Sequence, residues 1–380
     1  MLVILTFITS GCCFSVGSIV IGKDCNKKMY CNNNSVEMEY AFNLPTSYSV
    51  SYQKAVKSVV TILAHSTFSN TSSSSGSGVV INTDDEYVYV VTNRHVVATK
   101  PSNYQLFYNN IEVLFSDYTR VKGTLIAAAS SIDVAVIKIA KNNLLADYEL
   151  PVVKNSFTDI SIGDSVFAVG SPLGQNHAFS ASFGSISNLY NTKVDFVSAG
   201  LGYYYPIQID AAVNPGNSGG GLFNSNGELI GMIQGGRTTS TEGDTTIETT
   251  GINYAIPITT VLNVANQLIS AENYQEVDIG IDKNYMEDIK EMSSGDRLSL
   301  SIPDTDKVGL FVRHVGASGA AHDAGMSSHF VIESFDNISA DSIGQWEMYL
   351  GSKTVGEKIE VKGHYVNRPT EEVTYLITLR

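Results

Sequence analysis

Short strand-like runs recur along this sequence, and turn residues separate them about every 8 to 12 positions. Such spacing is typical of an all-β barrel or sandwich and not of alternating βαβ units. The predicted strands lie at 78–81, 87–92, 104–107, 111–115, 120–127, 134–139, 165–169, 207–209 and 229–234. We therefore expect a mainly β fold.

Three further segments complete this pattern. Residues 55–64 are apolar enough for a first strand with a short lead-in, and the Ser/Gly-rich stretch 70–78 predicts a flexible turn. Residues 259–270 place apolar side chains at helical spacing and predict a helix that closes this part of the chain. A short polar joint, 271–277, then leads into a second, smaller module, 278–380.

Composition bounds what the chain can do. Its 380 residues allow two or three domains, and a hydrophobic content of 43% with 16% charged residues excludes a largely disordered protein. The 24 basic and 38 acidic residues give a formal net charge of 24 − 38 = −14. Nucleic-acid binding requires a clustered basic face, so we expect no nucleic-acid partner.

All four cysteines, Cys12, Cys13, Cys25 and Cys31, lie near the N-terminus. The folded part therefore has no disulfide framework, no thiolate metal site and no cysteine nucleophile. Cys25 and Cys31 can pair across a short loop, or both can be free thiols. We expect neither a cofactor nor a metal ion in the chemistry of this protein.

Residues 1–22 carry no charged side chain, and as a helix of about 33 Å they would cross a hydrocarbon core of about 30 Å. A membrane anchor, a cleaved signal peptide and a lipoprotein signal, suggested by the motif at 9–12, all remain open. A polar linker, 23–48, follows. We expect the protein at the cell membrane or envelope, anchored N-terminally, with the folded part outside the cytoplasm.

The most informative stretch is the glycine-rich turn Asn214-Pro-Gly-Asn-Ser-Gly-Gly-Gly221. Its glycines leave the hydroxyl of Ser218 uncrowded. The backbone N–H groups of Gly216 and Ser218 can point the same way, as donors to a developing oxyanion must. By itself such a turn is usually only a turn, and a serine hydroxyl is inert without a base.

A candidate base and a candidate carboxylate occur earlier in the chain. His95 ends the strand-like run 90–97, and Asp133 directly precedes the strand at 134–139. Separately, the histidine could be an ordinary packed residue and the aspartate a turn or cap residue. Together with Ser218 they follow one of the known triad orders, His…Asp…Ser, with each member at a strand end beside a loop.

Five motifs in order resemble the HtrA (high-temperature requirement) family of trypsin-like serine proteases. They are Gly76-Ser-Gly-Val79, Thr92-Asn-Arg-His95, Asp133-Val-Ala-Val136, Gly170-Ser-Pro-Leu-Gly174 and Asp210-Ala-Ala-Val-Asn-Pro-Gly-Asn-Ser-Gly-Gly220. The resemblance covers a predicted protease domain, 49–270. It implies a trypsin/chymotrypsin-like double β-barrel, with six strands in each barrel and the active cleft between them.

The same resemblance implies roles for individual residues. His95 is the expected base, Asp133 its orienting carboxylate and Ser218 the nucleophile. The expected oxyanion hole consists of Gly216, Asn217 and Ser218.

The resemblance also implies a specificity pocket. The segment 251–257 resembles the family's strand along that pocket, and the pocket floor lies six positions before the nucleophile, at Ala212. An uncharged floor with Tyr254, Ala255 and Ile256 as an apolar wall predicts loose cleavage after aliphatic residues.

The C-terminal module resembles a PDZ domain. Val308, Gly309 and Leu310 resemble its carboxylate-binding loop, and 310–313 would be the groove strand whose free edge takes peptide C-termini. Further matches are Gly319–Met326 to a short helix and turn, and 330–336 and 358–362 to later strands. The alternative is a divergent domain that only packs against the protease.

Two functions remain in view. The first is a serine endopeptidase that cleaves misfolded or unfolded proteins in the cell envelope. The second is a PDZ-bearing chaperone or scaffold whose protease site is idle at rest. An α/β-hydrolase esterase is disfavoured, because its triad order would be Ser…Asp…His. The resemblance further implies a homotrimer formed through the N-terminal edge of the protease domain. Phe42, Tyr48 and Tyr52 are candidate interface residues there, and ordinary core residues are the alternative.

Overall fold

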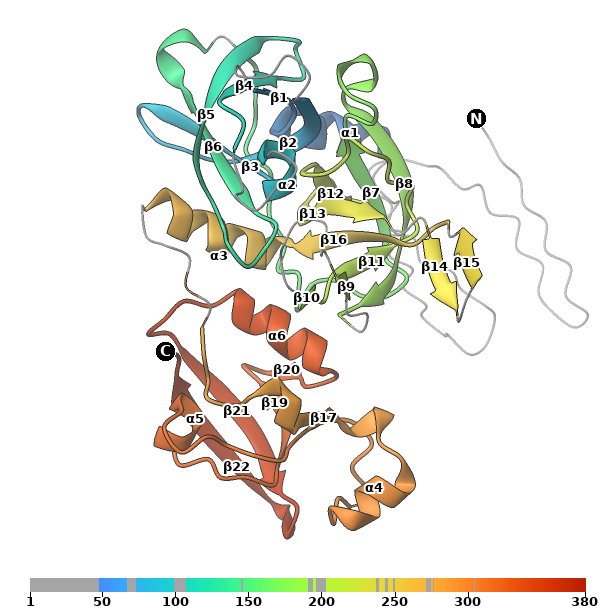
Figure 1. The fold of residues 1–380 in the computed structure, drawn as a ribbon, viewed down its shortest axis with the longest axis vertical. Coiled ribbons are helices and arrows are strands. Elements are labelled where there is room, and N and C mark those ends of the chain that lie inside the picture. Colours follow the sequence, from blue (N-terminus) through green and yellow to red (C-terminus); the bar gives the residue numbers. More distant parts are fainter. Residues whose placement is uncertain are drawn as a thin grey trace, which may run out of the picture. The chain divides into compact units, whose positions relative to one another are not determined.

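The computed structural model describes residues 48–66, 73–98, 107–144, 146–190, 194–195, 203–236, 239–242, 245–248, 250–270, 275, 277–303 and 305–380 (Figure 1). The predicted membrane segment, the four cysteines and Phe42 lie outside these residues, as does most of the predicted joint 271–277. Within the described residues, no helix has both the length and the apolar character that a membrane crossing requires.

Six strands close a first barrel in the order β1-β2-β3-β6-β5-β4. They are β1 Val59–His65, β2 Ser73–Thr83, β3 Tyr87–Thr92, β4 Asn110–Leu114, β5 Arg120–Ala128 and β6 Ala135–Ala140. Valine and isoleucine fill the interior, with Val60, Val90 and Ile137 fully buried, because β-branched side chains suit a pleated, enclosed surface. The short helix α2, Arg94–Val97, follows β3.

The start of this barrel differs from the prediction in two places. Residues Tyr48–Ala55 form helix α1, followed by a 3-10 turn at Val56–Ser58, so the first strand begins only at Val59. The stretch expected to be a flexible turn is instead largely strand β2. A Cβ on Gly76 or Gly78 would lie 2.6 Å from a valine side chain, so the small residues here allow close packing.

A second closed barrel has the order β11-β16-β13-β12-β7-β8. Its strands are β7 Ser165–Gly170, β8 Ser180–Leu189, β11 Ile207–Ile209, β12 Gly221–Asn224, β13 Leu229–Gly236 and β16 Asn253–Pro257. Helix α3, Ile258–Ile269, follows β16 and packs its apolar face on the same core. The predicted mainly β fold with two six-stranded barrels is confirmed.

Two small strand pairs accompany the second barrel. Strand β9, Val194–Asp195, pairs with β10, Tyr203–Tyr204, and β14, Thr239–Glu242, pairs with β15, Thr245–Glu248. The second pair lies within the polar stretch between β13 and β16.

The C-terminal module is built on a third sheet, in the order β17-β18-β19-β21-β22 with β20 paired to β19. Its strands are β17 Met286–Asp288, β18 Leu310–Val312, β19 Phe330–Phe335, β20 Ile338–Ser339, β21 Lys358–Tyr365 and β22 Arg368–Thr378. Its helices are α4 Ser294–Ser299, α5 Ala320–Asp323 and α6 Ile343–Gly351, and short 3-10 turns span Lys283–Tyr285 and Ile289–Glu291.

This topology corrects one prediction. Strand β18 pairs with β19 on one side and with β17 on the other, so the segment expected to offer a free edge is enclosed. The loop Val308–Leu310 therefore cannot lead a ligand strand onto β18. Strand β17 holds the edge position instead, and its three residues, Met-Glu-Asp, were too few and too polar to stand out in the sequence.

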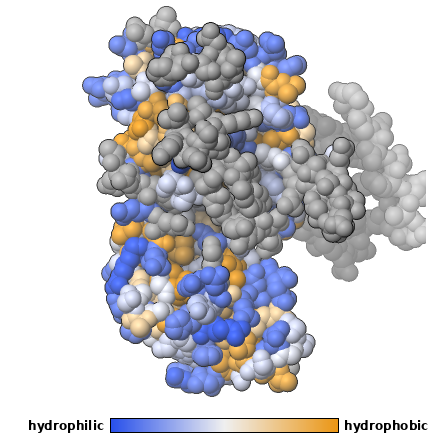
Figure 2. Space-filling view, viewed as in Figure 1, coloured by the Kyte–Doolittle hydropathy of each residue, from blue (hydrophilic) through white to orange (hydrophobic). Residues whose placement is uncertain are grey.

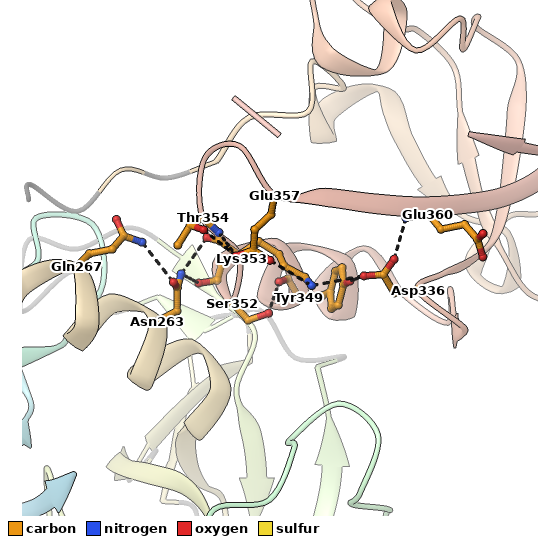
Figure 3. A network of polar contacts seen from close by, with 10 residues as sticks. Asn263, Gln267, Asp336, Tyr349, Ser352, Lys353, Thr354, Glu357 and Glu360 are labelled. Atoms are coloured by element: carbon orange, nitrogen blue, oxygen red, sulfur yellow. Dashed lines mark hydrogen bonds and ion pairs between the residues drawn. The ribbon is translucent and has the colours of Figure 1, made fainter. Parts of the chain in front are cut away.

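Residues of the two-barrel part of the chain contact both ends of helix α6. At its start, the Ser342 hydroxyl caps the helix by accepting the Gln345 N–H and donates to the Tyr190 carbonyl. At its end, the Asn263 amide of α3 donates to the Gly351 and Lys353 carbonyls, at 3.0 and 2.9 Å (Figure 3). Gly351 is the last residue of the helix, where a carbonyl has no partner within the helix, and Lys353 follows two residues later. Asn263 thus satisfies a carbonyl that would otherwise need water.

The polar contacts continue from Asn263 into the C-terminal module. Lys353 Nζ lies 3.4 Å from Asp336 Oδ2, and the Tyr349 hydroxyl donates to the same carboxylate oxygen (Figure 3). The Asp336 Oδ1 atom accepts the Glu360 N–H of β21. The network thus connects the end of α6 to the third sheet.

The two described aromatic residues of the expected trimer edge make contacts within the chain. The Tyr48 ring packs edge-on to Phe183 at 4.9 Å, and the Tyr52 hydroxyl donates to the Phe179 carbonyl at 2.6 Å. Phe183 itself remains 51% exposed. On the face shown in Figure 2, hydrophilic and hydrophobic residues are interspersed.

Candidate active site

The three predicted triad residues lie at the ends of elements in both barrels. His95 is on helix α2, directly after β3, and Asp133 precedes β6. Ser218 lies in the turn before β12 of the second barrel. The turn meets the first barrel, because the Ser77 N–H of β2 donates to the Ser218 carbonyl at 2.8 Å. A Cβ on Gly76 would touch both Val96 and the Ser218 carbonyl, so β2 adjoins the helix of His95 and the serine turn.

The histidine and the aspartate form a tight pair. Asp133 Oδ2 lies 2.7 Å from His95 Nδ1, and Oδ1 accepts the backbone N–H of His95 at 3.0 Å. The Asn93 side chain also donates to the Asp133 carbonyl, and Asp133 is only 2% exposed. A buried carboxylate held in this way fixes the imidazole orientation and leaves Nε2 as its remaining nitrogen.

Asp133 also affects the proton affinity of the histidine. Burial lowers the pKa of His95, but the charge of Asp133 and the hydrogen bond that it accepts outweigh this effect. The pKa of His95 is consequently raised above its ordinary value.

The serine turn requires glycine at two positions. Gly216 has φ +102° and Gly219 φ +86°, in the region that favours glycine. A Cβ would lie 2.4 Å from the Ser171 carbonyl oxygen at Gly216, and 2.1 Å from the Ser77 carbonyl oxygen at Gly219. The glycines that made this turn conspicuous in the sequence therefore allow it to fit closely against its neighbours.

The predicted oxyanion-hole residues differ in how their N–H groups are used. The Asn217 N–H donates to the Asn214 carbonyl at 3.0 Å, which closes the turn. The Gly216 carbonyl accepts the Ser77 hydroxyl at 2.8 Å, which fixes the peptide that follows Gly216. Asn217 is thus occupied within the turn, and the donors proposed for an oxyanion are the N–H groups of Gly216 and Ser218.

The Ser218 hydroxyl has a partner on strand β13. Its Oγ donates to the Gln234 carbonyl at 2.9 Å. A hydroxyl carries one proton, so Ser218 cannot donate to His95 Nε2 at the same time. The hydroxyl must therefore leave the Gln234 carbonyl before it can pass its proton to the histidine.

The predicted specificity residues lie in two different environments. Ala212 is exposed, and its carbonyl accepts the Ser182 hydroxyl of β8 at 2.6 Å. Tyr254 is 3% exposed, whereas Ala255 and Ile256 are fully buried in the core of the second barrel. Successive side chains of a strand face opposite sides, so Ala255 does not share a face with Tyr254 and Ile256.

Sequence reasoning missed Gln234. Its side-chain amide donates to Asp133 Oδ2 at 3.1 Å, and the residue is 2% exposed. The available signal was a polar residue within the otherwise apolar run of strand β13, since buried polar side chains usually have a specific partner.

Comparison with known proteins places these features in a family. A family model described as "Trypsin-like peptidase domain" matches residues 76–232. The chain is 32% identical over 297 residues to "Serine protease Do-like HtrA" of Lactococcus lactis subsp. cremoris (strain MG1363), an alignment covering 76% of this chain and 67% of that protein. It is 29% identical over 314 residues to the protein of the same name from Bacillus subtilis (strain 168), covering 82% and 64% respectively.

A solved structure gives a similar result. The chain matches "HtrA-type protease AlgW with tripeptide" with a TM-score of 0.56 and 26% identity, over 88% of this chain and 98% of that one. The two curated relatives are named as serine proteases. The double barrel and the paired His95 and Asp133 agree with these matches, and the chain therefore belongs to the HtrA family of serine proteases and is a serine endopeptidase.

Proposed function

We propose that this endopeptidase cleaves unfolded or misfolded polypeptides through a Ser-His-Asp acyl-enzyme mechanism. The observation that carries the proposal is the Asp133 carboxylate, which binds both His95 Nδ1 and the His95 backbone N–H. In this geometry the base is oriented before substrate arrives. The neighbouring turn supplies Ser218 together with the backbone donors that an oxyanion needs.

In the proposed reaction, His95 carries the proton from Ser218 to the leaving group. The Ser218 hydroxyl passes its proton to His95 Nε2 as Oγ forms a bond to the substrate carbonyl carbon, and the resulting oxyanion accepts the Gly216 and Ser218 N–H groups. The protonated His95 then gives its proton to the leaving amine as the C–N bond breaks. Water, deprotonated by His95, hydrolyses the acyl-enzyme and restores the serine. Asp133 stays ionised and stabilises the imidazolium.

One contact supports the alternative, a PDZ-bearing chaperone or scaffold whose protease site is idle at rest. The Ser218 hydroxyl donates to the Gln234 carbonyl, and its one proton is then not directed at His95, which supports a protease site that is idle at rest. We propose that substrate binding releases the hydroxyl. Fluorophosphonate labelling of Ser218, measured with and without unfolded casein present, should distinguish an idle enzyme from one that is always competent.

We propose a loose preference for aliphatic residues at the position before the scissile bond. Ala212 carries no charge to pair a substrate lysine or arginine. One methylene in an apolar pocket is worth only about 1–3 kcal/mol, so the preference should be broad.

We also propose that the C-terminal module is PDZ-like and takes peptide C-termini at strand β17. This strand holds the edge of the sheet. Helix α6 begins beside it, since the Ile343 N–H donates to Asp288 Oδ1 at 2.7 Å. A peptide added as a further strand would be bound mainly through its backbone.

Two wider proposals rest on the family and on the N-terminal sequence. We propose a homotrimer that uses the edge around Tyr48 and the half-exposed Phe183, which sedimentation analysis would test. We also propose that residues 1–22 place the protein at the cell envelope. Recovery of the full-length protein in the soluble cytoplasmic fraction after lysis would contradict this.

Casein digestion by residues 33–380 tests the proposed function. The wild-type protein should cleave casein, and Ser218→Ala should lower the rate by about 10⁴-fold or more. Mass-spectrometric mapping of the fragments should show mainly Val, Ala or Ile before the cleaved bonds. Full cleavage by purified Ser218→Ala would overturn the mechanism, and cleavage mainly after Lys or Arg would overturn the specificity.

A further inference from the structure

The Asp133 carboxylate accepts a hydrogen bond that the triad does not supply. Its Oδ1 accepts the backbone N–H of His95, and its Oδ2 faces both His95 Nδ1 at 2.7 Å and Gln234 Nε2 at 3.1 Å. The Gln234 donor thus binds the same oxygen that orients the base. A carboxylate held at both oxygens from separate elements cannot swing about its Cβ–Cγ bond without losing one of these bonds.

The amide of Gln234 has only one orientation that suits this site. Turning it over would bring Oε1 against the Asp133 carboxylate, and two acceptors cannot share a hydrogen bond. In the orientation found, Oε1 is buried and has no hydrogen-bond partner among the described residues. Leaving a buried amide oxygen unpaired is unfavourable, and the bond from Nε2 to a charged acceptor offsets this.

Gln234 also contacts the nucleophile through its backbone. Its carbonyl accepts the Ser218 hydroxyl at 2.9 Å. The adjoining residue, Ile233, exchanges backbone bonds with the serine turn, accepting from the Gly219 N–H and donating to the Gly220 carbonyl. One residue of β13 therefore touches the orienting carboxylate with its side chain and the nucleophile with its main chain.

We propose that Gln234 is a positioning residue that fixes the Asp133 carboxylate so that His95 presents Nε2 to Ser218. This inference rests on the proposed triad mechanism. Gln234 acts through Asp133 and does not itself exchange a proton with substrate. By sharing Oδ2 with a neutral donor, it also moderates the charge that His95 receives from the carboxylate.

The test compares Gln234→Met, which keeps the length and loses the donor, with wild type and with Gln267→Met. Gln267 is also buried, and its amide donates within helix α3 to Asn263, so it controls for the loss of a buried amide elsewhere. The readouts are the pH profile of kcat/KM for labelled casein and the rate at which Ser218 reacts with a fluorophosphonate. Thermal unfolding is measured for each variant.

Gln234→Met should lower kcat and the fluorophosphonate rate by about tenfold and leave KM little changed. A tenfold loss is what the transition state would lose with one hydrogen bond. The acidic limb of the pH profile should move to higher pH, because the undivided Asp133 charge stabilises the imidazolium more strongly. Gln267→Met should leave both the limb and the labelling rate at their wild-type values.

Gln234→Glu is the second variant, should Gln234→Met fail to fold. Two carboxylates at this separation repel each other, which raises the pKa at which the second one ionises. The introduced group therefore remains protonated at lower pH and donates as the amide does. Its fluorophosphonate rate relative to wild type should therefore be highest at the acidic end and fall as pH rises. If a folded Gln234 variant keeps the wild-type rate and pH profile while Ser218→Ala is inactive, the positioning role is wrong. If Ser218→Ala is itself active, the proposed triad is wrong.

Discussion

The backbone N–H of Ser77 donates to the carbonyl of Ser218 at 2.8 Å, which joins a strand of the first barrel to the serine turn of the second. The same residue donates its hydroxyl to the Gly216 carbonyl, and its own carbonyl accepts the Thr92 hydroxyl. Ser77 is fully buried. Two of these bonds attach the serine turn to strand β2, and the third attaches β2 to β3 of the barrel that holds His95 and Asp133.

The first prediction concerns Gly219. Gly219→Ala should destabilise the fold by about 1–3 kcal/mol or more, because φ is +86° and the new Cβ would lie 2.1 Å from the Ser77 carbonyl oxygen. Gly295→Ala is the matched control. Gly295 is exposed in helix α4, and an added Cβ would lie 3.7 Å from Ser293 Oγ, so this change should stabilise by about 0.5–1 kcal/mol. Urea unfolding that ranks the two variants equally would contradict the close fit of the serine turn.

The second prediction concerns pH. The base must be neutral to accept the serine proton, so activity should be present above the raised pKa of His95 and lost as pH falls through it. The acidic limb of the kcat/KM profile should therefore lie above pH 6.5, the ordinary histidine value. The same shift stabilises the folded protein below the unfolded pKa, and this contribution is lost as pH rises through the folded pKa.

A direct measurement isolates the cause of that shift. NMR titration of His95 in Ser218→Ala, which avoids autolysis, should give a pKa above the ordinary value. Adding Asp133→Asn removes the charge and leaves burial, so the titration should move to lower pH. An unchanged titration in the double variant would mean that Asp133 does not set the proton affinity of the base.

The third prediction concerns the contact between helix α6 and the protease. A Cβ on Gly344 would lie 1.9 Å from the Tyr190 carbonyl oxygen and 2.3 Å from the Tyr205 ring, so Gly344→Ala should push the start of α6 away. Gly351→Ala, in the same helix, would place its Cβ at an ordinary 3.4 Å from the Thr260 side chain. Hydrogen exchange across 343–351 should accelerate in the first variant only, and equal exchange in both would contradict the docked position of α6.

The fourth prediction concerns the edge at β17. Full-length Ser218→Ala, titrated with a fluorescent peptide ending in Val or Phe, should bind the free acid more tightly than the C-terminal amide. Amidation removes the charge that backbone N–H groups would hold. Equal binding of both peptides, or no binding up to about millimolar concentration, would leave the module with only a packing role.

The sequence by itself determined the elements with strong local signals. Strand β3 and strand β11 have the predicted bounds, and helix α3 begins one residue before its predicted start. The sequence also indicated the order of His95, Asp133 and Ser218 and the glycine-rich turn around Ser218. Both can be recognised from short segments of the chain.

Only the tertiary structure decided the features that depend on distant partners. Ser73–Gly78 became strand because β1 pairs with it and Val90 and Val96 leave no room for larger residues. Strand β17 forms because it pairs with β18, and its three polar-rich residues have no strong strand preference of their own. Gln234 reaches Asp133 across 101 positions of the sequence. Hydrophobic periodicity reports the local environment of each residue, whereas strand edges and buried hydrogen-bond partners are fixed only when separate parts of the chain meet.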